Sequence, residues 1–245
     1  MKYIASVSFG KDSLAMVIML IQKNYPLDWI IFYDTGMEFK AIYRMKRKFQ
    51  IWLFFVNILR ILQGNNWIRF KTLQPHKPFL WTMFEKPVNG KNGAHNGYSW
   101  CGGMCRWGTT EKLKALEQFC KGSIEYVGLA ADEPKRLEKE RKGNKIFPLS
   151  GWGITEAECL QFCYQHGYTW KECGIRLYDI LDRVSCWCCS NKNLKELRNY
   201  YHYLPQYWQK LKALQCRTAR PFKGKGKSVF ELENRFQQEE RQHNE

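Results

Sequence analysis

The string SVSFGKDS, at residues 6–13, carries the residue types of a phosphate-binding turn. Gly10 allows the backbone to approach a phosphate closely, and the start of a following helix offers free N–H groups and a positive dipole end. Ser8 and Ser13 add hydroxyl donors, and Lys11 adds a positive charge. A glycine-containing turn before a helix is often an ordinary loop, so the prediction depends on the whole string in its strand-to-helix context.

A second polar string, Asp34-Thr35-Gly36, follows an apolar strand predicted over residues 28–33. Ligands of open α/β sheets bind beyond the carboxyl ends of the strands. We therefore expect these three residues to contribute to a ligand site. The alternative is that Asp-Thr-Gly forms nothing more than a turn.

Two groups of closely spaced cysteines form the third motif. Glycines between Cys101 and Cys105 let the chain fold back, and the C-x-x-C spacing of Cys186 and Cys189 lets two thiolates share one ion. Four thiolates suit a tetrahedral Zn²⁺, our first choice because it needs no redox partner, or an iron–sulfur cluster. Buried small side chains or a redox disulfide are the alternatives. Cys188 is a spare member, either a ligand or a free thiol.

The elements that position these residues follow from apolar periodicity. Residues 3–8 predict a buried strand, residues 13–23 a helix, and residues 28–33 a second strand. This strand–helix–strand order is a βαβ unit, which builds a parallel sheet. A further strand is expected at 124–130. Helices are expected from Thr155, whose pairing with Glu158 makes a capping box, and over 191–215.

Composition limits the class of protein. The 245 residues carry a formal charge of +16, which favours a polyanionic partner, either nucleotide phosphates alone or also a nucleic acid. A solvated basic surface is the alternative. The apolar run at 51–62 contains Asn57 and Arg60 and is too short to span a bilayer, so we expect it to be buried. No secretory signal is visible, and the clustered cysteines favour a reducing cytoplasm.

Three parts of the chain are predicted. Residues 1–170 form a nucleotide-binding α/β domain, 171–216 a helical segment stapled by the metal, and 217–245 a polar, partly mobile tail. The predicted fold class is α/β, a mostly parallel twisted sheet flanked by helices, with the cysteine metal site in the later part of the chain.

Four segments resemble one known family in the expected order. SFGKDS resembles the modified P-loop of the PP-loop ATP pyrophosphatase superfamily and is most similar to the phosphoadenosine phosphosulfate (PAPS) reductase branch. FYDTGMEF resembles the signature after the family's second strand. GLAADEPKR resembles a later strand end, with Glu133 and Arg136 as the counterparts, and PLSGWGITEAE resembles a scaffold segment in which Trp152 packs and Thr155 caps a helix.

The resemblance implies an adenine-nucleotide-α-hydrolase-like fold that binds an adenine nucleotide, either ATP or PAPS/APS. Applied to this chain, it gives the following nucleotide-binding residues: Ser8, Gly10, Lys11, Ser13, Asp34, Thr35, Gly36, Glu133 and Arg136. It also implies cleavage at the α-phosphate with Mg²⁺, for which Asp12, Lys11 and Asp34 are the catalytic residues. Family relatives insert sulfur into DNA or RNA, so tRNA or DNA, a sulfur donor and a partner subunit are implied partners; no membrane is expected.

Two other functions stay open. A PAPS/APS-type reductase would use Cys188 or Cys173, which lies in KECGIR at 171–176 but lacks the histidine of the family's nucleophile motif. A zinc-stapled nucleic-acid-binding protein would keep the nucleotide pocket only for sensing.

Overall fold

The computed structural model describes residues 1–90, 93–101, 104–139 and 144–244, and the chain folds into two compact units. The first unit comprises residues 1–34, 40–74 and 113–170. The second comprises residues 35–39, 75–112 and 171–245. The first unit ends at residue 170, and segments 35–39 and 75–112 belong to the second unit.

A five-stranded sheet forms the centre of the first unit, in the order β3-β2-β1-β6-β7. Its strands are β1 (Tyr3–Ser6), β2 (Trp29–Tyr33), β3 (Arg69–Leu73), β6 (Ile124–Val127) and β7 (Lys145–Ile146). Every neighbouring pair is parallel. The predicted α/β class with a mostly parallel sheet is confirmed, and the predicted strands at 3–8 and 124–130 both end earlier than expected.

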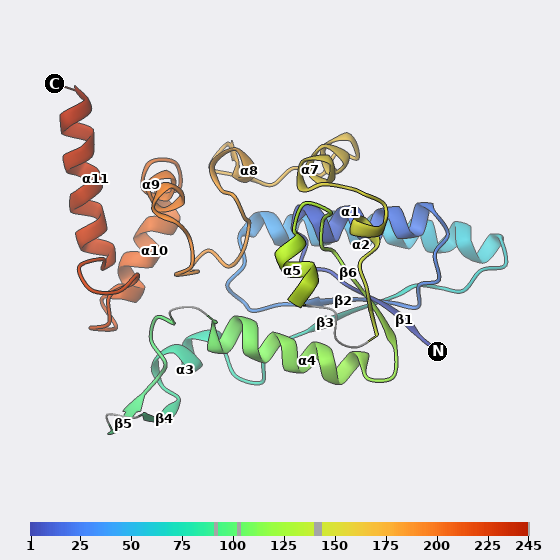
Figure 1. Ribbon diagram of the computed structural model, residues 1–245, viewed down its shortest axis with the longest axis horizontal. Coiled ribbons are helices and arrows are strands. Elements are labelled where there is room, and N and C mark those ends of the chain that lie inside the picture. Colours follow the sequence, from blue (N-terminus) through green and yellow to red (C-terminus); the bar gives the residue numbers. More distant parts are fainter. Residues whose placement is uncertain (91–92, 102–103, 140–143, 245) are drawn as a thin grey trace. The chain divides into compact units, whose positions relative to one another are not determined.

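Helices cover both faces of this sheet (Figure 1). Helices α1 (Lys11–Gln22) and α2 (Lys40–Leu62) lie on one face, and α4 (Glu111–Cys120) lies on the other. Against α4, Ile4 and Ile31 form a buried cluster with Leu116 and Cys120. Because parallel sheets are buried on both faces, their strands are short continuous apolar runs, which is the pattern that the sequence shows.

Three further helices complete the first unit. They are α5 (Pro134–Lys139), α6 (Pro148–Gly151) and α7 (Glu156–Gln165). The predicted capping box is confirmed, since the Thr155 side chain accepts from the Glu158 N–H and the Glu158 carboxylate accepts from the Thr155 N–H. The Trp152 indole packs edge-on against Tyr25.

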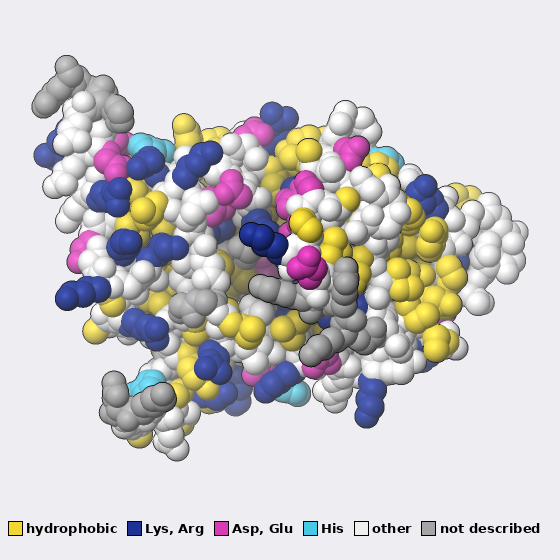
Figure 2. Space-filling view, in the orientation of Figure 1, with side chains coloured by type: hydrophobic (Ala, Val, Ile, Leu, Met, Phe, Trp, Pro, Cys, Tyr) yellow, Lys and Arg dark blue, Asp and Glu magenta, His cyan; other side chains and the backbone are white. Residues whose placement is uncertain are grey.

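The expectation that residues 51–62 are buried is wrong. They belong to the 23-residue α2, and Phe54, Phe55 and Leu59 are all more than half exposed. A helix can turn only one stripe toward its sheet, and this run is apolar around its whole circumference. Figure 2 shows hydrophobic side chains gathered at the right of the view, where α2 ends. The polar Asn57 is instead buried, because its amide pairs with both backbone groups of Ile68.

No described helix is long and apolar enough to cross a membrane.

The second unit is mainly helical. It holds α3 (Phe79–Phe84), the hairpin of β4 (Pro87–Gly90) and β5 (Gly93–Asn96), the π-helix η1 (Arg106–Thr110), the hairpin of β8 (Lys171–Glu172) and β9 (Ile175–Arg176), α8 (Leu177–Ile180), α9 (Leu194–Tyr203), α10 (Pro205–Gln215) and α11 (Val229–Asn244). The helix expected over 191–215 is two helices, because Pro205 opens a new first turn after Leu204. The segment expected to be a polar tail contains α11, whose Leu232 and Phe236 are buried.

Gly128, just beyond β6, gives the first testable prediction. A Cβ built there would lie 2.8 Å from the Ser13 Cα, which is backbone at the start of α1 and cannot swing aside. We expect Gly128→Ala to lower the free energy of unfolding by about 2 kcal/mol, since overpacking forces a backbone shift.

The matched control is Gly151→Ala. A Cβ at Gly151 meets nothing within 4 Å, and the residue lies in α6. We expect this control to be neutral or slightly stabilising. Urea unfolding of both variants measures the difference, and equal stabilities would contradict the close approach at Gly128.

Candidate functional site

The turn between β1 and α1 is built around Phe9, which has a positive φ of 58°. A bulky side chain in this region of the backbone map is uncommon and costs free energy unless packing enforces it. Here the ring is fully buried and packs edge-on against Phe32 and Phe49, with centroid distances of 5.2 and 5.6 Å. The buried ring therefore fixes the backbone at the residue before Gly10.

Trp170 stabilises the same turn through a hydrogen bond to its backbone. Its indole Nε1 donates a 2.7 Å hydrogen bond to the Phe9 carbonyl oxygen, and its ring is fully buried. The sequence analysis missed this residue, because 161 positions separate it from Phe9. No local pattern signals such a contact.

The predicted residues Ser8, Gly10 and Ser13 come together at the turn. The Ser8 N–H donates to the Ser13 hydroxyl oxygen at 3.1 Å, and the two hydroxyl oxygens lie 3.0 Å apart. Gly10 is the N-cap of α1 and has no side chain to cap the helix. A helix N-terminus whose N-cap residue offers no side-chain acceptor is the feature that an anion-binding turn uses.

Lys11 is buried beside two carboxylates. Its Nζ lies 2.9 Å from the Asp12 Oδ1 and also bonds the carboxylate of Glu156, a residue of α7 that the sequence analysis did not single out. Burial alone would lower the pKa of Lys11, but Asp12 and Glu156 outweigh it and raise the pKa above its ordinary value. The ammonium group therefore stays charged at the start of α1.

The pKa of Asp12 is also raised, which for a carboxyl group disfavours the charged form. Burial raises the pKa of its carboxyl group, the Lys11 charge opposes that rise, and the charges of Glu156 and Glu133 add to it. Two further carboxylates thus act on Asp12, while Lys11 is the cation that bonds Asp12 and Glu156. A phosphate arriving here would add negative charge, so the cation and the helix N–H groups must carry its binding.

Glu133 and Arg136 pair with each other. Glu133 is buried at the start of α5, and its Oε1 accepts a 2.5 Å hydrogen bond from the Arg136 Nη1. The Arg136 side chain is half exposed. For Arg136 to bind the nucleotide as predicted, its guanidinium group would have to turn toward the ligand or donate to the ligand and to Glu133 at the same time.

The Asp-Thr-Gly string divides between the two units after Asp34. Asp34 follows β2 in the first unit, where its Oδ1 accepts a 2.7 Å hydrogen bond from the Tyr43 hydroxyl. Thr35 and Gly36 belong to the second unit. There the Thr35 hydroxyl donates to the Glu38 carboxylate at 2.9 Å and lies 3.4 Å from the Cys186 sulfur.

This arrangement links the second motif to the late cysteine group. The Cys186 thiol donates to the Glu38 carboxylate at 3.5 Å, and the Trp187 N–H donates to the Met37 carbonyl oxygen at 3.0 Å. The sequence analysis treated Thr35 only as a nucleotide-site residue and did not anticipate this contact with Cys186.

The four predicted metal ligands all lie in the second unit. The Ser190 hydroxyl donates to the Cys101 carbonyl oxygen at 2.6 Å, so the two cysteine segments are adjacent. The Cys105 sulfur accepts a 3.2 Å hydrogen bond from the Gly108 N–H, which caps η1. Cys189 lies near Cys186 and Cys188, whose pKa values it helps to raise.

The sulfur atoms do not form a ready ligand set. Among the described residues, no three His, Cys, Asp or Glu side chains are grouped so that they could hold a metal ion. Burial raises the pKa of the Cys186 and Cys188 thiols well above their ordinary value, and neighbouring Glu38 and cysteines add to the rise. Cys105 of the first cysteine group also acts on Cys188 of the second, so the two groups are near one another, and the four-thiolate site stays a prediction. The cysteines of the first unit, Cys120, Cys159 and Cys163, are buried core residues.

Two proteins of Methanocaldococcus jannaschii are similar to this chain. The uncharacterized protein MJ0973 is 25% identical over 222 residues, covering 83% of this chain and 46% of its own length. The uncharacterized protein MJ0066 is 22% identical over 222 residues, covering 83% of this chain and 39% of its own length. The chain thus spans less than half the length of these relatives.

A solved structure aligns with 97% of this chain and 71% of its own. It is the U34-tRNA thiolase NcsA from Methanococcus maripaludis with its [4Fe-4S] cluster, at a TM-score of 0.44 and 14% identity. So distant a likeness transfers neither substrate nor cluster to this chain.

A family model matches most of the chain. The phosphoadenosine phosphosulfate reductase domain matches residues 2–191, a span that contains the turn at Ser8–Ser13, the Asp-Thr-Gly string and both cysteine groups. The chain belongs to the phosphoadenosine phosphosulfate reductase domain family.

Proposed function

We propose that the first unit binds an adenine nucleotide at the turn from Ser8 to Ser13 and that the protein cleaves the nucleotide between its α- and β-phosphates. The observation that carries the proposal is the uncapped N-terminus of α1 beside the buried, charged Lys11. Family membership supports the nucleotide class.

Different residues of this chain would have different roles in binding the nucleotide. The first-turn N–H groups of α1 and the hydroxyl groups of Ser8 and Ser13 hold the pyrophosphate end, while Lys11 offsets its charge. Asp12 and Asp34 are the predicted magnesium-holding or water-positioning groups. Mg²⁺ typically binds through one or two carboxylates plus substrate phosphates, so no preformed cage is needed, and when bound it neutralises charge developing on the phosphates.

The proposed reaction is adenylylation followed by displacement. An acceptor oxygen attacks the α-phosphorus, a new P–O bond forms, and pyrophosphate leaves with the bonding electrons. A sulfur donor then displaces AMP from the activated acceptor. We propose a tRNA or DNA acceptor because the net charge of +16 suits a polyanion; the donor and any partner subunit must come from outside this chain.

The family name also favours sulfonucleotide reduction, with PAPS or APS as the substrate. Of the two thiols considered for it, Cys188 is buried and its pKa is raised by that burial, which disfavours a thiolate nucleophile. Cys173 is exposed, with a φ of 50° in the turn between β8 and β9. A reductase would therefore have to use Cys173, whereas a nucleotide-sensing, nucleic-acid-binding protein would show no turnover at all.

Turnover is tested with ATP labelled at the α-phosphate, in the presence of Mg²⁺, with and without tRNA or DNA. We expect the wild type to release AMP. We expect Asp12→Ala to release AMP about a hundredfold or more slowly, because the substitution removes a carboxylate that is proposed to act beside the reacting phosphates. Chromatography that separates AMP from ADP gives the readout. The control is Glu117→Ala on the exposed surface of α4.

If wild type and control release no AMP with either nucleic acid, ATP cleavage is refuted. PAPS with thioredoxin is then the next substrate, with Cys173→Ser as its diagnostic variant. Nucleic-acid binding without any turnover would support the sensing protein.

Charge pairing at the turn gives the next prediction. Lys11→Met keeps the side-chain volume but leaves Asp12 and Glu156 without their shared cation. We expect Mg²⁺–α,β-methylene ATP to bind at least about tenfold more weakly, as measured by isothermal titration calorimetry. We also expect the free energy of unfolding to fall by about 3 kcal/mol, because breaking a buried pair leaves a charge without its partner.

Adding Glu156→Gln to Lys11→Met should restore about 1 kcal/mol of stability, since it removes one stranded carboxylate. Lys114→Met, on the exposed surface of α4, is the control for losing one positive charge. A nucleotide affinity in Lys11→Met equal to that of the control would refute the role of Lys11.

The cysteine metal site remains a prediction, and elemental analysis of anaerobically purified protein tests it. Metal binding would deprotonate and gather the thiols. The prediction is about one zinc ion or one iron–sulfur cluster per chain. Loss of this metal in Cys105→Ser and Cys189→Ser, but not in Cys216→Ser, would support the site. Wild-type protein that contains no metal would contradict the predicted site.

A further inference from the structure

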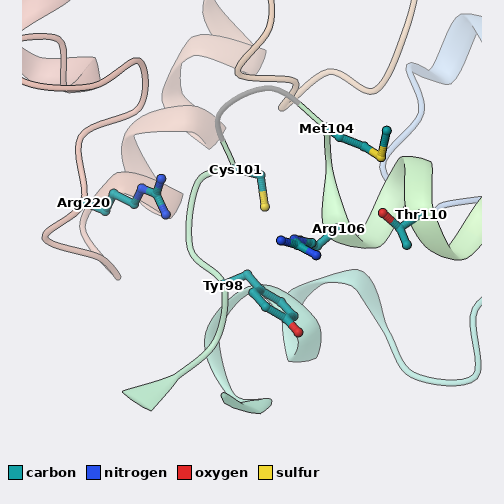
Figure 3. A pocket seen from close by; sticks show the side chains of 6 residues that line it. All are labelled: Tyr98, Cys101, Met104, Arg106, Thr110 and Arg220. Atoms are coloured by element: carbon teal, nitrogen blue, oxygen red, sulfur yellow. The ribbon is translucent and has the colours of Figure 1, made fainter. Parts of the chain in front are cut away.

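The second unit contains a pocket of about 440 Å³, whereas the turn at Ser8–Ser13 belongs to the first unit. It is lined by Tyr98, Cys101, Met104, Arg106, Thr110 and Arg220. Figure 3 shows the guanidinium groups of Arg106 and Arg220 converging on the space beside the Cys101 sulfur. Among the described lining residues there are two arginines and no carboxylate, so the charge of this pocket suits an anion.

Neither arginine has an acidic partner among the interactions of the described residues. Arg217, three residues before Arg220, is paired with Glu85, and Arg198 and Arg235 on nearby helices are paired with Glu239. Arg106 and Arg220 thus differ from these other arginines of the second unit, because no carboxylate among the described residues offsets their charge and it can act on a ligand. Both side chains are exposed at the pocket, so a ligand can reach them.

The backbone that presents Arg220 is firmly held. Gln215, which is buried at the end of α10, donates 3.0 Å hydrogen bonds to the carbonyl oxygens of Thr218 and Arg220 and accepts one from the Phe222 N–H. The Phe222 ring packs edge-on against the buried Trp100, at a centroid distance of 4.7 Å. The loop before α11 is therefore anchored to the segment that carries Cys101.

The opposite wall is anchored as well. The Tyr98 N–H donates to the Thr82 carbonyl oxygen at 3.2 Å, and the Ser99 N–H donates to the Met83 carbonyl oxygen at 2.8 Å. The Ser99 hydroxyl lies 2.5 Å from that of Thr218, which ties this wall to the loop of Arg220. Segments that are held in place before binding lose less entropy when a ligand enters.

The size and the surroundings of the pocket indicate the ligand. A volume of about 440 Å³ exceeds what one phosphate needs and suits a nucleotide unit, with Tyr98 and Met104 as its apolar wall. Residues 217–227 contain five Lys or Arg residues and no Asp or Glu. Figure 2 shows Lys and Arg side chains gathered over the region of α9, α10 and α11. Phosphates on either side of a bound one would therefore also meet cations, which favours a strand over a single nucleotide.

We propose that this pocket binds a nucleotide unit of a single-stranded nucleic acid, with its phosphate held between Arg106 and Arg220. The inference rests on the proposed function for its purpose, because the strand would be the acceptor. The binding itself needs no turnover. Measurements without ATP therefore test the pocket even if α-phosphate cleavage is refuted.

The test uses fluorescence anisotropy of the full chain with a labelled 20-nucleotide single-stranded RNA and its DNA equivalent. We expect Arg106→Gln/Arg220→Gln to weaken binding about tenfold and to make the salt dependence shallower by about one unit of slope. The matched control, Arg176→Gln/Arg241→Gln, removes the same charge from elsewhere in the second unit. Equal losses in both double variants would overturn the proposal.

A second measurement uses the wild type, so that it does not depend on the variants folding. Phenylglyoxal modifies accessible arginines, and peptide mass spectrometry reads each site. We expect the RNA to protect Arg106 and Arg220 but not Arg241. Protection by AMP or inorganic phosphate, with none by RNA or DNA, would assign the pocket to a free anion and overturn the strand proposal.

Discussion

The turn between β1 and α1 depends on one constraint, the positive φ of Phe9. A non-glycine residue holds this backbone conformation only if its surroundings enforce it. Here the ring is buried among aromatic side chains, and the Trp170 indole binds the Phe9 carbonyl oxygen. These contacts place Gly10, which has no side chain for capping, at the N-cap of α1. The geometry of the proposed phosphate-binding turn is thus a consequence of hydrophobic packing beneath it.

Charge balance is the second constraint on the same turn. An isolated ammonium group loses free energy when it is buried, and an isolated carboxylate does so as well. Lys11, Asp12 and Glu156 solve this jointly, because each keeps a partner of opposite charge. Burial is the main cause of the rise in the Asp12 pKa, and the charges of Glu156 and Glu133 add to it. A cation bound beside Asp12 would favour its charged form, which fits the proposed use of Mg²⁺.

The second unit gathers residues from three separate parts of the chain. Thr35 and Glu38 contact Cys186, and Cys101 lies next to Ser190 and in the pocket with Arg106 and Arg220. One consequence is that Cys101 has cations as its electrostatic neighbours. Burial raises the pKa of its thiol, against the lowering effects of an Arg106 backbone hydrogen bond and the charges of Arg220 and Arg106. A family motif, a cysteine group and an anion pocket therefore share one compact unit.

The sequence by itself determined the parallel α/β sheet, the strand-to-helix turn at Ser8–Ser13 and the capped helix from Thr155, because these depend on local periodicity and on residues within a few positions of one another. The resemblance to the family rested on local strings, and the family match over residues 2–191 confirms it. Tertiary structure decided the rest. Local patterns could not show that Glu156 neutralises Lys11, that Trp170 holds Phe9, or that α2 exposes much of its apolar surface. Those outcomes depend on which distant segment packs against each residue, and only the folded chain fixes that.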